Sequence, residues 1–177
     1  TKYSEFIKET EVTKKNVLNK INEALNCQEN KDLFLFYFTG HGILSDTGEP
    51  GLLMSDSSII TKTELKNILK NNNKNQKIIL FGDFCYSGLL VDIAKELYAD
   101  GLDVNAITSA SSNLSTGNWS YTQTLIDSFS GRTIVDKDKN GFITFFDMAQ
   151  EVQNVMFNRE RQKSDHFILP DLKNSKI

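Results

Sequence analysis

The hydrophobic positions of the chain form short continuous runs, separated by longer segments with helical periodicity. Two runs stand out, residues 32–38 and 77–82, which are rich in Phe, Ile and Leu. Short apolar runs that end at turn-forming residues are typical of buried β-strands. The first run leads into Gly40-His41-Gly42, and the second leads through Asp83 to Cys85. A reactive side chain therefore follows each of the two predicted strands.

The segments around these runs repeat apolar residues at intervals of three or four, which predicts amphipathic helices. Strands that alternate with helices indicate an α/β fold with a mostly parallel central sheet and helices on both faces. We expect helices over 11–25, 61–70, 89–98, 121–129 and 145–159, further short strands at 52–54, 104–108 and 167–170, and loops at 45–51 and 109–118.

Length, charge and composition narrow the class of protein. A chain of 177 residues is one domain by length and can bury a substantial core. A net charge of −3 gives no electrostatic footprint for nucleic acid or an anionic membrane, and no apolar run reaches membrane-spanning length. The first residues contain no apolar signal core and no starting Met, so we expect a fragment or processed product. Two distant cysteines form neither a disulfide framework nor a zinc site, which favours an intracellular, cytoplasmic setting.

The two predicted strand ends carry the candidate chemistry. Ligands and catalytic groups gather at the carboxyl ends of parallel strands, so His41 and Cys85 are expected side by side. A thiolate is a strong nucleophile, and an imidazole can remove its proton and later protonate a leaving group. The backbone N–H groups of Gly42 and Cys85 could form an oxyanion hole. Acyl transfer from an amide or ester is the reaction class that this set predicts.

Each of these residue types also has a purely structural interpretation. Cysteine is often an inert core residue, and that interpretation suits Cys27 at the end of a predicted helix. It suits Cys85 poorly, because polar and turn-forming residues flank it. A lone histidine is usually structural, which is our interpretation of His166. His41 lies between two glycines, which favours an exposed side chain with a functional role.

The segments Phe36-Tyr37-Phe38-Thr39-Gly40-His41-Gly42 and Asp83-Phe84-Cys85-Tyr86-Ser87-Gly88 resemble the His and Cys boxes of caspase-like cysteine peptidases, above all metacaspases and their bacterial relatives. His41 and Cys85 are 44 residues apart, in keeping with the roughly 50 residues typical of caspases. The resemblance implies a caspase-like sandwich, residues 1–177 forming one peptidase domain that lacks the first strand and helix of the fold. A missing N-terminal segment or a second chain would complete it, and proteins would be its substrates.

Two observations predict which substrate side chain the site would select. In relatives of this kind the residue two before the nucleophile lines the specificity pocket, and here it is Asp83. A carboxylate there would pair with Arg or Lys, and Ser109 is expected to line the same pocket. Residues 113–117, where true caspases carry a pocket Arg, contain neither Arg nor Lys. An alternative role for Asp83 is a structural acid that caps the turn by accepting backbone N–H bonds. Trp119 could form the wall of a neighbouring subsite, or it could be an ordinary core residue.

Residues 136–147 fit the spacing of the twelve-residue EF-hand calcium loop, with oxygen-bearing side chains at positions one, three, five, nine and twelve and Gly at six. Position twelve is Asp147, which reaches less far than the usual Glu. The alternative is a glycine turn leading into a helix. We expect no cofactor to be required for the chemistry, with calcium a hypothesis for this loop.

The sequence therefore predicts a cysteine endopeptidase with a dyad of Cys85 and His41, cleaving after Arg or Lys. Two alternatives from other classes stay open. One is a catalytically silent caspase-like scaffold, and the other is a calcium-responsive interaction module in which Cys85 is incidental.

Overall fold

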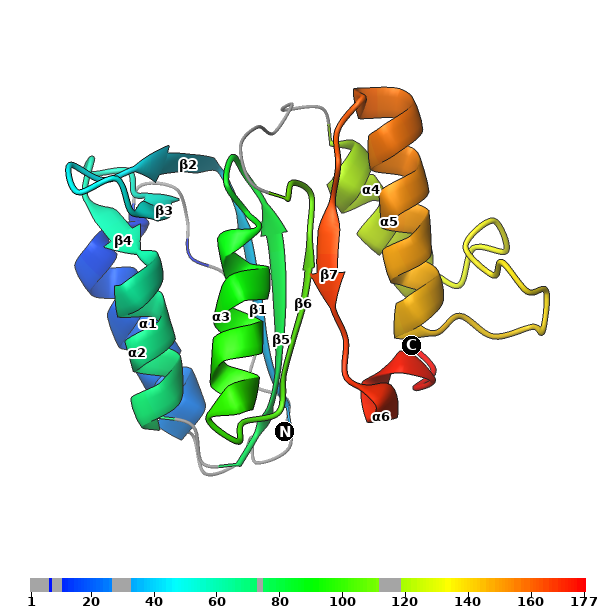
Figure 1. Ribbon diagram of the computed structural model, residues 1–177, viewed down its shortest axis with the longest axis horizontal. Helices are drawn as coiled ribbons and strands as arrows, with labels where there is room; N and C mark the ends of the chain where they lie inside the picture. Colours follow the sequence, from blue (N-terminus) through cyan, green and yellow to red (C-terminus); the bar gives the residue numbers. More distant parts are fainter. Residues whose placement is uncertain (1–6, 8–10, 27–32, 73–74, 112–118) are drawn as a thin grey trace.

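The computed structural model describes residues 7, 11–26, 33–72, 75–111 and 119–177. A four-stranded sheet runs through its middle in the order β1-β5-β6-β7, with helices on both faces (Figure 1). β1, β5 and β6 are parallel, and β7 is antiparallel to β6 at the edge. The predicted fold class, a mostly parallel sheet between two helical layers, is confirmed.

The elements follow each other as strands and helices in alternation, with one β-rich insertion after β1. The helices are α1 (Lys14–Asn26), α2 (Lys62–Asn72), α3 (Leu89–Ala99), α4 (Ser120–Phe129), α5 (Phe145–Glu160) and α6 (Pro170–Lys173). The strands are β1 (Leu33–Thr39), β2 (His41–Leu44), β3 (Pro50–Leu53), β4 (Ile59–Thr61), β5 (Lys77–Asp83), β6 (Val104–Thr108) and β7 (Asp165–Phe167).

The core has two layers because successive residues of a strand point to opposite faces of the sheet. Ile78 and Leu80 of β5 pack with α1, α2 and α3 on one face. Ile79 and Phe81 of the same strand pack with α4 and α5 on the other. β5 is buried on both faces, as a central parallel strand should be. Its continuous apolar run follows from this position.

Side-chain caps lie at the starts of α1 and α2. The Thr13 hydroxyl accepts a hydrogen bond from the Asn16 backbone N–H at the start of α1. At the start of α2, Thr61 and Glu64 exchange the two bonds of a capping box. Each cap satisfies backbone N–H groups that have no partner within the helix.

Three details differ from the sequence prediction. The chain does not leave the sheet region after Gly40 but turns into β2, which pairs with β3 and β4 in a small antiparallel sheet. The last strand lies at 165–167 rather than 167–170, because Pro170 begins the short helix α6. The short strand expected at 52–54 lies at 50–53 as β3, the middle strand of this second sheet, and Leu52 and Met54 are buried.

β1 forms one edge of the central sheet, and one of its faces is partly uncovered. Leu33, Leu35 and Tyr37 are 47%, 47% and 39% exposed, whereas Phe34 between them is buried. The expectation that a further segment or second chain completes the fold stays a prediction, and this face is where such a segment would find apolar side chains. Among the helices in the described part of the chain, none combines the length and hydropathy needed to cross a membrane.

Candidate functional site

The ends of β1 and β5 bring the two predicted boxes together. The strands are parallel neighbours in a register that pairs Thr39 with Asp83, the last residue of each strand. The Gly40 N–H donates to the Asp83 carbonyl at 3.3 Å, which extends the contact past the strand ends. His41 and Cys85 each follow two residues after that last pair. Both side chains therefore leave the same edge of the sheet, as the sequence predicts.

The contact continues between Gly42 and the main chain of Cys85. A β-carbon at Gly42 would stand 1.7 Å from the Cys85 carbonyl oxygen and 2.7 Å from the Phe84 ring, so only glycine fits. Beneath this contact the rings of Phe38 and Phe84 meet edge to face, with centroids 5.3 Å apart. The ring contact and the backbone contact together hold the two boxes against each other.

Cys85 lies in a tight turn between β5 and α3. The Ser87 N–H donates to the Phe84 carbonyl at 3.1 Å, and the Leu89 N–H donates to the Tyr86 carbonyl at 3.0 Å. Tyr86 has a φ of 65°, a left-handed conformation that costs free energy in a residue other than glycine. Cys85 is half-buried, and the amino end of α3 follows four residues later. A helix amino end favours nearby negative charge, including a thiolate.

His41 is exposed and opens β2, where it is paired in register with Leu53 of β3. The pairing within the antiparallel sheet thus fixes the backbone of His41. The expectation that the flanking glycines leave His41 accessible agrees with this position. An imidazole in solvent contact can exchange protons with water and with a group at the sheet edge.

Asp83 lies half-buried at the same edge and is part of a hydrogen-bonded network. Its Oδ2 accepts from the Thr122 hydroxyl at 2.8 Å, and the Tyr37 hydroxyl lies 2.8 Å from the same Thr122 oxygen. Because the Thr122 proton points to Asp83, Tyr37 is the donor in the second bond. The phenol, the hydroxyl and the carboxylate thus form a chain from β1 through α4 to β5.

Burial raises the pKa of the Asp83 carboxyl, and the nearby charge of Glu160 acts in the same direction. Hydrogen bonds from Thr122 and Ser109 partly oppose the shift. Ser109 is fully buried at the end of β6, and it shares Asp83 as a partner. The structure therefore brings together the two residues that were predicted to line one pocket. A desolvated carboxylate of this kind gains more from a cationic partner than an exposed one does.

Thr122, Tyr37 and Glu160 belong to this site but were not found from the sequence. Thr122 and Glu160 lie 39 and 77 residues beyond Asp83, on helices whose positions over the sheet the sequence does not give. A threonine in the first turn of a helix carries no signal that separates it from an ordinary surface residue.

The other predicted residues fall as follows. Trp119 is 74% exposed before α4, so it is not a core residue. His166 lies in β7, where Gln153 bonds its Nδ1 at 3.2 Å, and burial lowers its pKa. It is separated from His41 by the width of the sheet. Cys27 and residues 113–117 lie outside the described residues.

The loop of residues 136–147 has its carboxylates turned toward the backbone. Asp136 accepts from the N–H groups of Asn140 and Gly141, and Asp147 accepts from the N–H and hydroxyl of Thr144 in the capping box of α5. Within the described ranges no three His, Cys, Asp or Glu side chains gather as a metal-binding group. The alternative of a turn that leads into a helix explains these contacts. Calcium binding stays a hypothesis, and no chemical step depends on it.

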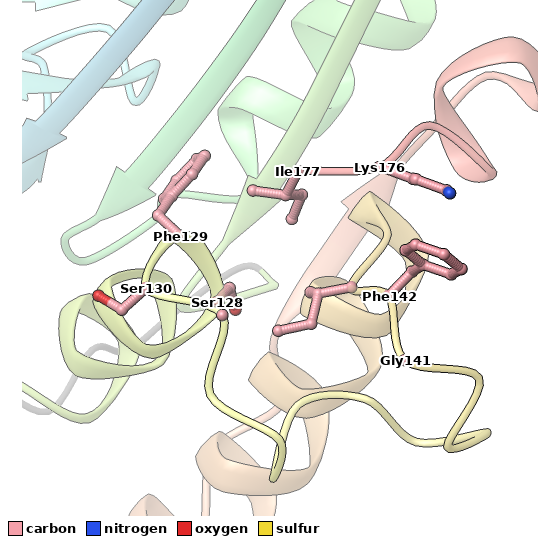
Figure 2. A pocket seen from close by; sticks show the side chains of 9 residues that line it. Ser128, Phe129, Ser130, Gly141, Phe142, Lys176 and Ile177 are labelled. Atoms are coloured by element: carbon pink, nitrogen blue, oxygen red, sulfur yellow. The ribbon is translucent and has the colours of Figure 1, made fainter.

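A cavity of about 380 Å³ lies away from this site, between the last turn of α4, the loop before α5 and residues 176–177 (Figure 2). Phe129, Phe142 and Ile177 form much of its wall. The five predicted site residues are all described, and none of them lines it. The cavity therefore has no part in the chemistry proposed at the sheet edge.

The fold and this sheet edge define a caspase-like protein. A sequence profile described as the caspase domain matches residues 3–165, and the chain belongs to this family. Family membership indicates cysteine-peptidase chemistry.

Metacaspase-6 of Arabidopsis thaliana is 27% identical over 157 residues, which are 77% of this chain and 43% of that protein. The chain thus spans less than half of that relative's length. A crystal structure of a Geobacter sulfurreducens protein superposes with a TM-score of 0.61 at 16% identity, covering 94% of this chain and 78% of that one. At this identity the likeness concerns the fold alone.

Proposed function

We propose that the chain is a cysteine endopeptidase that cleaves proteins after Arg or Lys, with Cys85 as nucleophile and His41 as general acid and base. The packing of Gly42 against the Cys85 carbonyl supports this most directly, because it holds the two boxes together at a carboxyl edge of the sheet. Intact boxes in a caspase-domain chain favour an enzyme over a silent scaffold.

In the proposed reaction His41 takes the proton of the Cys85 thiol as Sγ attacks the carbonyl carbon. The N–H groups of Gly42 and Cys85 donate to the resulting oxyanion. The C–N bond then breaks, His41 gives its proton to the departing amine, and a thioester remains. His41 next deprotonates a water molecule, which attacks the thioester and releases the carboxylic acid product and the thiol.

The specificity proposal rests on Asp83. Its half-buried carboxylate lies at the same sheet edge as Cys85, held by Thr122 and Ser109. A substrate guanidinium or ammonium would supply the positive charge that this carboxylate needs, and an acidic side chain would be repelled.

The test compares fluorogenic peptides ending in Arg, Lys, Asn or Asp, with and without calcium, for the parent protein and Cys85→Ala. We expect cleavage after Arg and Lys by the parent and none by Cys85→Ala. In parallel, an arginyl chloromethyl ketone should alkylate Cys85, as located by mass spectrometry. Equal cleavage by Cys85→Ala would refute the mechanism, and cleavage of Asp peptides alone would refute the Asp83 pocket. A parent that neither cleaves nor is alkylated would favour the scaffold alternative.

A further inference from the structure

Ser87 lies two residues after Cys85 and is completely buried. Its Oγ accepts a hydrogen bond from the Ala110 N–H at 3.0 Å and lies 3.3 Å from the Ala110 carbonyl. The Ser109 hydroxyl is 3.5 Å away. One buried side chain of the nucleophile turn is thus bonded to the segment that follows β6.

The same two segments are in close backbone contact at the next residue. A β-carbon at Gly88 would stand 1.6 Å from the Ser111 carbonyl oxygen. On the other side of Cys85, the Ser109 N–H donates to the Gly82 carbonyl at 2.8 Å. Contacts before and after Cys85 therefore attach its turn to residues 109–111.

Residues 109–111 also form part of the proposed pocket. Ser109 hydrogen bonds with the Asp83 carboxyl. Farther from Cys85, Gln162 donates to the Ser109 carbonyl at 2.5 Å and the Ser111 N–H donates to the Lys163 carbonyl at 2.8 Å. The segment is thus fixed on one side by the chain after α5 and on the other by Ser87.

We propose that Ser87 is a positioning residue, which sets Cys85 relative to the pocket of Asp83 and Ser109. This inference rests on the proposed function. A substrate held by its basic side chain presents its carbonyl at one place, so the sulfur must lie within reaction distance of that place. A displacement of about 1 Å can cost about 100-fold in rate. A small alkylating reagent that does not use the pocket is insensitive to such a displacement.

The test measures two reactions at Cys85 in Ser87→Ala. The first is inactivation by an arginyl chloromethyl ketone, which uses the pocket, together with kcat/KM for an Arg peptide. The second is alkylation by iodoacetamide, followed at Cys85 by mass spectrometry. We expect the pocket-dependent rates to fall roughly 10- to 100-fold, while the iodoacetamide rate and its pH profile stay unchanged. The matched control is Ser128→Ala, a buried serine whose hydroxyl donates to the Thr124 carbonyl within α4, and both of its rates should equal the parent's.

Unchanged pocket-dependent rates in Ser87→Ala would overturn the inference. An equal fall in both reactions would also overturn it, because the role would then concern the thiolate itself or the stability of the turn. If Ser87→Ala does not unfold cooperatively, the same two reactions are measured in Ser87→Thr. Its added methyl group enters a completely buried position, and the same selective loss is expected.

Failure of the proposed function is distinguishable from failure of this inference. A parent protein whose Cys85 is inert to the arginyl reagent refutes the proposed function, and the inference falls with it. A parent that reacts, beside a Ser87→Ala variant that reacts equally fast, refutes the positioning role alone.

Discussion

Gly42 packs so closely on Cys85 that a β-carbon at residue 42 would stand 1.7 Å from the Cys85 carbonyl oxygen. The contact joins residues that are 43 positions apart in the sequence, and it does so beyond the last paired residues of β1 and β5. The proposed dyad and oxyanion hole depend on this contact, because His41 precedes Gly42 directly and both proposed N–H donors belong to the touching residues.

The Gly42→Ala variant is therefore expected to lose peptide cleavage. The added methyl group must push the two boxes apart, which displaces His41 from Cys85 and disturbs the oxyanion site. We expect at least a 100-fold lower kcat/KM, on the scale of removing one oxyanion donor, measured with the Arg peptide. Gly48→Ala is the control: nothing lies within 4 Å of its β-carbon position, so activity should persist despite its positive φ. Full activity in Gly42→Ala would contradict the proposed geometry.

The fall of kcat/KM at acid pH should reflect the protonation of Asp83. Burial raises the pKa of this carboxyl, so the negative charge that attracts a basic side chain is lost at a higher pH than for an exposed carboxyl. Thr122→Val removes a hydrogen bond that stabilises the ionised form. The fall of kcat/KM at acid pH should then begin at a higher pH in this variant, mainly because KM rises. A fall that begins at the same pH in Thr122→Val as in the parent would show that Asp83 does not control binding.

Asp83→Asn should abolish the preference for Arg and Lys yet stabilise the fold at neutral pH. Because the pKa of Asp83 is raised in the folded state, that state holds the proton more tightly than the unfolded chain does. The resulting stability is present at low pH and is lost as pH rises through the raised pKa. At neutral pH the buried charge of the Asp83 carboxylate lowers the free energy of unfolding, and Asn carries no such charge. Denaturation at pH 7 and pH 4 should show the gain at pH 7 only, and a loss at pH 7 would contradict this account.

Tyr121→Phe tests the packing of α4 on the sheet. The Tyr121 side chain is buried, and its hydroxyl donates to the Ile107 carbonyl of β6 at 2.6 Å. Its removal loses one buried hydrogen bond, which costs about 1 kcal/mol in the free energy of unfolding. Tyr98→Phe is the control, because Tyr98 is 52% exposed and keeps its ring contact with Phe167. Equal stabilities of the two variants in urea would contradict the role of this bond.

Calorimetric titration decides the calcium hypothesis for residues 136–147. As arranged, Asp147 caps α5 and Asp136 binds backbone N–H groups, so we expect no saturable heat at millimolar calcium. Saturable binding that disappears in Asp136→Asn would revive the hypothesis and would require Asp147 to leave its cap.

The pattern of apolar runs predicted both strands. β5 is buried or half-buried along its whole length, whereas β1, at the edge of the sheet, buries Phe34 and half-buries Phe36 and Phe38. The spacing of apolar residues predicted the helices, and Thr13 and Thr61 cap the first turns of two of them. The second sheet was not predicted, because four-residue strands such as β2 carry too little periodicity. Likewise, Trp119 could not be assigned to surface or core, since one aromatic residue gives no period.

The sequence by itself determined the two boxes, their order, and the acidic residue two positions before Cys85. It did so because strand ends and glycine turns are local features, readable within about ten residues. Only the tertiary structure decided which distant residues complete the site: the Gly42 contact with Cys85, the Thr122 bond to Asp83, and the Ser87 attachment to Ala110. These depend on strand register and on where α4 packs over the sheet, which follow from the packing of the whole core.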